Sequence, residues 1–86
     1  MKLKEGFILR TVAGETVVIP SGEELDLNVM ITLNDTARFL WEQLQEEKTL
    51  EQLVEATTAE YVVESEVAKT YIEEFVEKLD SNGFLA

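Results

Sequence analysis

The sequence predicts an α+β fold in which three short strands precede three helices within one small domain, residues 1–86. Two observations support this order of elements. Residues 1–33 contain short β-branched and aromatic runs between glycine, proline and polar turns, whereas residues 34–86 show the apolar period of amphipathic helices. In addition, 86 residues with 45% hydrophobic content provide for one core and little else.

The first two strands are expected at residues 7–12 and 15–19, joined as a hairpin. Ala13 and Gly14 lie between them, and glycine supplies the positive φ that a tight turn requires. Pro20 then ends the second strand, because proline has no amide proton for the sheet. This part of the chain therefore predicts an antiparallel pair.

The third strand is expected at residues 29–33, with the sequence VMITL, after the polar turn-like stretch SGEELDLN. As the last strand before a helix, it is expected at the edge of the sheet. It contains neither a proline nor a charge that would prevent another strand from pairing with it. Such an edge accepts an extended peptide by strand addition when an apolar groove lies beside it.

The first helix is expected at residues 35–46. Asn34 is a good N-cap, and the carboxylate of Asp35 lies in the first turn, where the helix dipole favours negative charge. Four apolar residues at i, i+3, i+4 and i+7 predict a core face. They are Ala37, Leu40, Trp41 and Leu44.

The second helix is expected at residues 50–61, and it opens with a T-x-x-Q capping box formed by Thr49 and Gln52. Its apolar residues keep the helical spacing. They are Leu50, Leu53, Val54 and Tyr61.

The third helix is expected at residues 65–82, with either Glu64 or Ser65 as its N-cap. It stops at Gly83, a typical residue just past a helix end. Phe84 and Leu85 can then fold back onto the core.

The third helix carries more apolar residues than one core face can hold. Five of them lie within an arc of ~100° and predict the core face: Ala68, Ile72, Phe75, Val76 and Leu79. A second stripe, rotated by roughly a quarter turn, contains Val67, Tyr71, Glu74 and Lys78. Val67 and Tyr71 are either ordinary residues at the edge of the core or one wall of a groove floored by the third strand.

The composition argues against an enzyme and against a resident cofactor or metal. The chain has no cysteine, so it offers no disulfide, thiolate ligand or thiol nucleophile, and no histidine, the usual general base and metal ligand. The segment Glu23-Glu24-Leu25-Asp26 lacks the spacing of a calcium loop. Asp80-Ser81-Asn82 resembles the Asp-Ser-Leu motif of acyl carrier proteins, which are also small and acidic. The modified serine of those proteins begins a helix, whereas Ser81 is expected at the end of one, so an acyl carrier protein is disfavoured.

The charge disfavours nucleic acids and anionic membranes as partners. The net charge is −11, and residues 41–86 carry twelve acidic and three basic side chains. Such a field repels phosphate and favours neutral or basic partners, although solvated helix faces also explain these charges. The N-terminal stretch MKLKEGF has no apolar signal segment, and no run is long enough to span a membrane, so a cytoplasmic protein is expected.

The order of elements and several motifs resemble the PqqD family, the small proteins named for pyrroloquinoline quinone biosynthesis. The resemblance covers residues 7–85. Its main motif is Leu33-Asn34-x-Thr36-x4-Trp41, supported by Tyr61 and by Phe75-x3-Leu79-x3-Gly83.

This resemblance implies the winged-helix-like fold known as the RiPP recognition element, with a three-stranded antiparallel sheet followed by three helices. It also implies a non-catalytic chaperone that captures the leader segment of a ribosomally synthesised precursor peptide and presents it to a modifying enzyme, often a radical SAM protein. The leader binds as an extra strand. The implied peptide-binding residues are Val29, Met30, Ile31, Thr32 and Leu33 on the strand and Val67, Tyr71, Glu74 and Lys78 on the helix.

Two alternatives stay open. The resemblance does not distinguish quinone-cofactor synthesis from another modified-peptide pathway. The other alternative is that the chain is a structural or regulatory interaction domain of winged-helix type and does not bind a precursor peptide. A DNA-binding winged helix is disfavoured, because the second helix carries Glu51, Glu55 and Glu60 and no basic residue.

Overall fold

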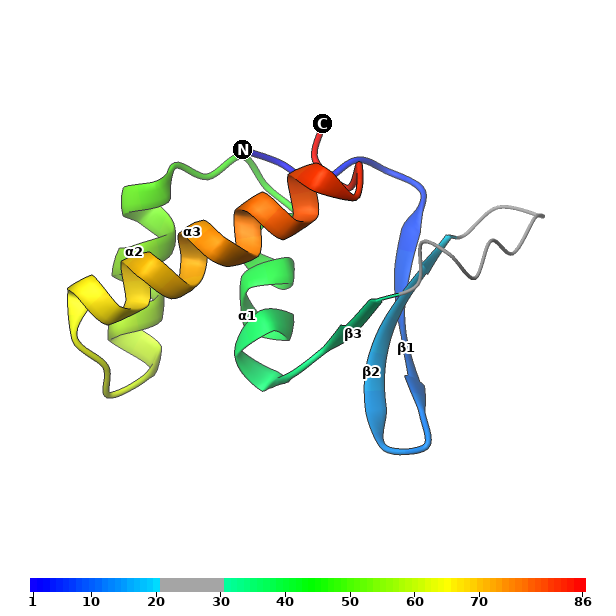
Figure 1. Cartoon of the computed structure of the whole chain (residues 1–86), viewed down its shortest axis with the longest axis horizontal. Helices are drawn as coiled ribbons and strands as arrows, with labels where there is room; N and C mark the ends of the chain where they lie inside the picture. The colour runs from blue at the N-terminus through cyan, green and yellow to red at the C-terminus, as the bar shows by residue number, and fades with distance from the viewer. Residues whose placement is uncertain (21–30) are drawn as a thin grey trace.

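The computed structural model describes residues 1–20 and 31–86. The described residues form three antiparallel strands followed by three helices, which confirms the predicted α+β fold (Figure 1). The strands are β1 (Phe7–Val12), β2 (Glu15–Pro20) and β3 (Ile31–Leu33), and the helices are α1 (Asp35–Gln43), α2 (Leu50–Glu60) and α3 (Ser65–Ser81).

β1 and β2 form the expected hairpin, with Phe7 opposite Pro20 and Val12 opposite Glu15. The turn residues Ala13 and Gly14 both have positive φ, at 52° and 81°. A two-residue turn with positive φ at both positions matches the right-handed twist of the paired strands. The hairpin extends away from the helices, and most side chains of β1 are exposed (Figure 1).

β3 pairs with the other side of β2, with Thr16 opposite Leu33 and Val18 opposite Ile31. The strand order is β1-β2-β3, so β3 lies at one edge of the sheet in the described part of the chain. Residues 29–30, the expected start of this strand, lie outside the described residues, as does the acidic stretch 23–26.

α1 begins as predicted, because the side chain of Asn34 accepts a hydrogen bond of 2.8 Å from the amide of Ala37. It ends at Gln43, however, and the expected end at residue 46 is wrong. In a helix that continued to residue 46, the amides of Gln45 and Glu46 would bond to carbonyls four positions earlier. Here they bond three positions back, to Glu42 at 3.3 Å and to Gln43 at 3.4 Å. The N-terminal segment bonds to the residues that follow the helix, since the amide of Leu3 donates to Leu44 at 2.9 Å and the amide of Lys48 donates to Met1 at 2.9 Å.

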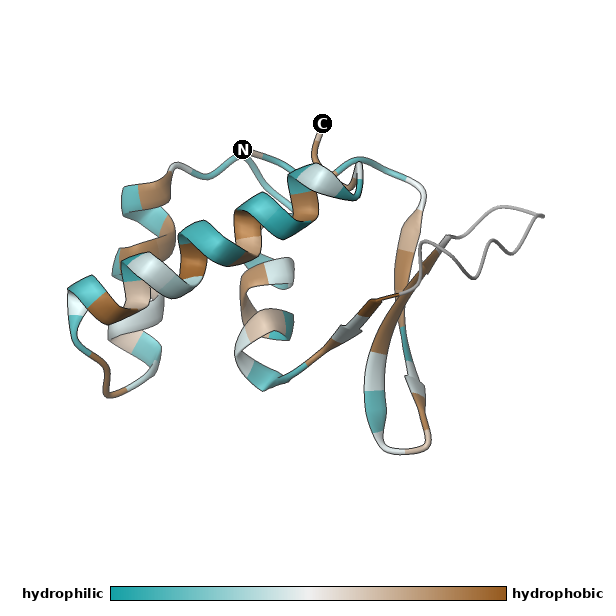
Figure 2. Ribbon diagram, viewed as in Figure 1, coloured by the Kyte–Doolittle hydropathy of each residue, from teal (hydrophilic) through white to brown (hydrophobic). Residues whose placement is uncertain are grey.

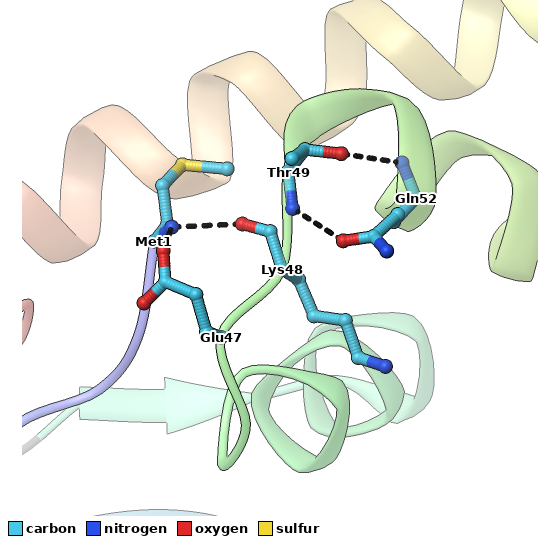
Figure 3. Close-up of polar contacts among 5 residues, drawn as sticks. All are labelled: Met1, Glu47, Lys48, Thr49 and Gln52. Atoms are coloured by element: carbon cyan, nitrogen blue, oxygen red, sulfur yellow. Dashed lines mark hydrogen bonds and ion pairs between the residues drawn. The ribbon is translucent and has the colours of Figure 1, made fainter.

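α2 opens with the predicted capping box. The amide of Gln52 donates to the hydroxyl of Thr49 at 3.1 Å, and the amide of Thr49 donates to the Gln52 side chain at 2.9 Å (Figure 3). The helix ends at Glu60, one residue before the expected end. Tyr61 follows the helix with extended backbone. Its ring packs edge-on against that of Phe39, with 5.5 Å between the ring centroids.

α3 begins at Ser65, so Ser65 is not the cap. Glu64 occupies the N-cap position, since its carbonyl accepts the first helical hydrogen bond, from Ala68 at 2.9 Å, while its side chain makes no capping bond. The helix ends at Ser81, one residue early, and Gly83 follows with φ of 76°. The amide of Phe84 bonds to the carbonyl of Leu79 at 2.9 Å, which is the Schellman closure expected of this glycine.

Phe84 folds back onto the core as predicted. Its ring is fully buried between Phe7, at 4.6 Å, and Trp41, at 5.7 Å between ring centroids. The chain ends lie side by side, because the amide of Lys4 donates to Phe84 at 2.8 Å and that of Ala86 donates to Lys2 at 2.8 Å (Figure 1).

The core lies among α1, α2, α3 and the inner face of β2 and β3. The predicted core residues of α3 are buried except Val76, which lies half-buried at the edge. Hydrophobic and hydrophilic residues alternate along α3 as expected of an amphipathic helix (Figure 2). The buried core residues are Leu3, Val18, Leu33, Ala37, Leu40, Trp41, Leu44, Leu53, Ala68, Ile72, Phe75, Leu79 and Phe84.

Candidate peptide-binding site

Among the described residues, no strand pairs with the outer edge of β3, which is called here the open edge. Within residues 1–20 and 31–86, β3 pairs with β2 alone. Alternate residues of an antiparallel strand direct their N–H and C=O groups to opposite sides, so Ile31–Leu33 presents main-chain groups at this edge. A further extended segment can bond to them.

A cavity of about 200 Å³ lies between this edge and α3. Thr32 and Leu33 line it from β3, while three predicted site residues line it from α3: Tyr71, Glu74 and Lys78. Asn34, Ala37 and Phe75 complete the lining. These eight residues define the β3–α3 groove, which brings together five of the nine predicted site residues.

Tyr71 connects the two walls of the β3–α3 groove. Its side chain is half-buried, and its hydroxyl donates to Oδ1 of Asn34 at 3.1 Å. The same oxygen caps α1 by accepting from the amide of Ala37 at 2.8 Å. Because Asn34 directly follows β3, this contact holds α3 at a defined distance from the strand.

Val67 lies beside the groove and does not line it. It is 58% exposed and borders an apolar cavity of about 220 Å³, which Tyr71 also lines. The other lining residues of that cavity are Thr36, Thr57, Tyr61, Val63 and Ala68. Tyr71 therefore belongs to both cavities and joins them into one surface.

The four predicted α3 residues form one flank of the helix, called here the groove flank: Val67, Tyr71, Glu74 and Lys78. Eleven steps of ~1.5 Å make this flank roughly 16 Å long. An extended peptide rises about 3.3 Å per residue, so roughly five residues of a bound strand match its length.

The strand residues differ in their positions. Thr32 is exposed and Leu33 is buried, and both line the groove. Ile31 is half-buried and packs against the core. Val29 and Met30 lie outside the described residues.

The charges of the groove are exposed. Glu74 and Lys78 stand one turn apart on α3, and no ion pair within the described part of the chain involves either of them. They offer one negative and one positive group to polar residues of a bound peptide. In residues 1–20 and 31–86, no group of three or more His, Cys, Asp or Glu side chains is arranged to hold a metal ion.

None of the described helices is long and apolar enough to cross a membrane.

The sequence prediction missed Ala37, Phe75 and Val63 as lining residues. Ala37 and Phe75 were assigned to the core alone, although each also reaches the groove. Val63 lies between α2 and α3, where periodicity carries no signal. Asn34 was recognised only as an N-cap, and its contact with Tyr71, 37 residues away, has no local signature.

Comparisons with known proteins identify structures of similar fold and the family of the chain. The chain is similar in fold to TbiB1 in complex with the TbiA(beta) leader peptide, with a TM-score of 0.76, 22% identity, and coverage of 99% of this chain and 94% of that one. It is also similar to lasso peptide synthetase B1 complexed with the leader peptide, with a TM-score of 0.71, 24% identity, and coverage of 96% and 93%. No curated protein is similar enough in sequence to count as a match. The sequence model of coenzyme PQQ synthesis protein D matches residues 15–85, and the chain therefore belongs to the PqqD family.

Proposed function

We propose that this chain is a non-catalytic peptide-binding protein that captures the leader segment of a ribosomally synthesised precursor peptide and presents it to a modifying enzyme. The observation that carries the proposal is the open edge of β3 beside the β3–α3 groove. Membership of the PqqD family supports it, and so do two structures of similar fold that are themselves leader-peptide complexes.

The leader binds as a strand antiparallel to β3, and its main chain bonds to the edge at Ile31–Leu33. Main-chain bonds of this kind give affinity, while pockets for alternate side chains give selectivity. Every second leader side chain points toward Tyr71 and is buried between α3 and the sheet. The charges of Glu74 and Lys78 select among polar leader residues at the rim.

The proposed peptide-binding residues are those expected from the sequence. β3 contributes Ile31, Thr32 and Leu33, and α3 contributes Val67, Tyr71, Glu74 and Lys78. Val29 and Met30, which precede β3 in the sequence and lie outside the described residues, complete the proposed set. The contact of Tyr71 with Asn34 preorganises the groove, which reduces the entropy lost on binding.

The core segment of the precursor stays free for the partner enzyme, which is a radical SAM protein or another peptide-modifying enzyme. This action belongs in the cytoplasm, where ribosomal precursors are made. A precursor reading frame and a modifying enzyme encoded beside this gene would support the proposal, whereas a gene that stands alone beside regulators would favour a regulatory interaction domain.

The test is a titration of the ¹⁵N-labelled chain with the leader segment of a precursor encoded beside its gene, followed by NMR. The expected result is saturable shifts at Ile31–Leu33, Tyr71 and Glu74. A leader with proline at the pairing positions is the matched control, because it lacks amide protons for the edge. Shifts confined to β1 or α2, or equal binding of the proline leader, would overturn the proposal.

A further inference from the structure

The opposite flank of α3 borders a second hollow surface. One cavity of about 440 Å³ lies between α2 and α3, and another of about 510 Å³ lies between α3 and the chain ends. Leu50 lines both cavities, so they form one continuous surface, called here the acidic face.

The floor of the acidic face is apolar, and its rim is negative. The floor consists of half-buried side chains: Met1, Leu50, Val54, Val76 and Leu85. The rim carries six exposed carboxylates: Glu51, Glu55, Glu66, Glu73, Glu77 and Asp80. Lys69 is the one basic side chain among the lining residues, and the α-amino group of Met1 is paired with Glu47.

The apolar floor and negative rim of the acidic face indicate which kind of surface can bind there. An apolar floor ringed by carboxylates fits an apolar protrusion surrounded by lysine and arginine, and such complementarity raises the association rate and selectivity. A second copy of the chain is a poor occupant in a symmetric contact, because an isologous interface brings the same patch of both copies together. The six carboxylates would then face their equivalents.

The acidic face and the β3–α3 groove are accessible at the same time. At about 100° per residue, the mean direction of the groove flank lies roughly 150° around the α3 axis from that of the residues lining the acidic face. The groove flank is Val67, Tyr71, Glu74 and Lys78, and the α3 residues lining the acidic face are Ser65, Glu66, Lys69, Glu73, Val76, Glu77 and Asp80. A ligand on one flank therefore does not obstruct the other.

From these observations we infer that the acidic face docks a second protein through a basic surface with an apolar centre, and that this protein is the enzyme that receives the captured peptide. The inference rests on the proposed function for the identity of the enzyme. It assigns capture and delivery to separate flanks of one helix, so that leader, presenter and enzyme form a ternary complex.

The test uses a defined mimic of such a surface: a synthetic amphipathic helix with leucine on one face and lysine on the other. The ¹⁵N-labelled full chain is titrated with it, and a leucine–glutamate helix is the matched probe. The expected result is shifts at Leu50, Val54 and Val76 with the lysine helix only, weakening as salt is added because the rim is exposed.

Two charge reversals on α3 separate a specific site from general attraction to an acidic protein. Glu73→Lys and Glu74→Lys change the net charge equally, but adjacent residues of a helix project about 100° apart, so that Glu73 lines the acidic face and Glu74 lines the groove. Glu73→Lys is expected to weaken binding of the lysine helix by roughly fivefold, and Glu74→Lys by less than about twofold. Val76→Thr and Val67→Thr form a matched pair for the apolar floor, and only Val76→Thr is expected to weaken binding.

Equal effects of the two reversals, no binding of the lysine helix, equal binding of the glutamate helix, or shifts confined to the groove would each overturn the inference. Leader titrations of the same samples keep the two proposals apart. If the unmodified chain does not bind its leader, the proposed function fails, while the acidic face is judged by the helix probe alone. If Glu73→Lys binds leader normally and binds the lysine helix more weakly, the two sites are separate.

Discussion

Tyr71 has two separable roles in the proposed site. Its ring lines the β3–α3 groove and the neighbouring apolar cavity, while its hydroxyl donates to Asn34 at the N-terminus of α1. In the proposed complex, the ring supplies apolar area for the leader, while the bond from the hydroxyl to Asn34 positions this wall of the groove. Substitutions that remove one group or both distinguish these roles.

Tyr71→Ala is expected to weaken leader binding by more than about tenfold, because a buried aromatic contact at an interface centre commonly exceeds ~1.4 kcal/mol. Tyr71→Phe keeps the ring and loses one exposed hydrogen bond, so a change of about threefold or less is expected. Isothermal titration with the leader measures both, and thermal unfolding checks that the fold persists. Unchanged affinity in Tyr71→Ala would remove this residue from the site.

The packing of the two chain ends against each other depends on Phe84. Its ring is fully buried and contacts both Phe7 and Trp41. Phe84→Ala is expected to lower the free energy of unfolding by about 3–5 kcal/mol, since it removes a ring and leaves a cavity. Urea unfolding measures the loss. Leu85 is the half-buried neighbour, and Leu85→Ala is the control. An equal loss of unfolding free energy in both variants would contradict the central position of Phe84.

At the level of elements, the sheet formed by the described residues has two edges, β1 and β3, and they differ in their surroundings. β3 borders the β3–α3 groove, whereas β1 lies mostly exposed on a hairpin that extends away from the helices (Figure 1). Strand addition at β3 therefore combines main-chain pairing with burial against a helix, which an isolated edge does not offer.

A matched pair of substitutions compares the two edges. Thr32 in β3 and Thr11 in β1 are both exposed. Thr32→Asp is expected to reduce leader affinity by about tenfold, because a charged side chain on an edge strand opposes pairing with a further strand. Thr11→Asp is expected to leave the affinity within about twofold. Fluorescence anisotropy of a labelled leader measures both, and the reverse pattern would move the binding strand to β1.

Elements with a local cause were predictable from the sequence. The hairpin follows from Ala13 and Gly14, the start of α2 from the Thr49 capping box, and the end of α3 from Gly83. The end of α1 was not predictable in this way. It depends on hydrogen bonds from the N-terminal segment to Leu44 and Lys48, which join residues more than forty positions apart.

The candidate site was predictable only in part for the same reason. The second stripe of α3 is visible in the sequence because periodicity places Tyr71 and Glu74 outside the core face. Which residues oppose that stripe depends on how α3 lies against β3 and α1. The contact between Tyr71 and Asn34, the lining role of Phe75, and the position of Val67 beside the groove all follow from that packing.

At the level of the whole molecule, α3 separates two surfaces of different chemistry. The β3–α3 groove combines an open strand edge with an aromatic wall, and the acidic face combines an apolar floor with most of the negative charge of α3. The net charge of −11 is therefore distributed unevenly, because most of the acidic side chains of α3 lie at the acidic face. In the proposed complexes, the strand edge pairs with the leader and the acidic face attracts a basic partner on the other side of α3.

Amide hydrogen exchange with and without leader tests the central claim most directly, because a leader strand that pairs with β3 must protect the amides that it bonds. The account predicts that exchange slows at the edge amides of Ile31–Leu33 and of the paired leader residues, while exchange in Phe7–Val12 stays unchanged. Unchanged exchange throughout β3 in a saturated complex, or new protection along β1, would contradict it.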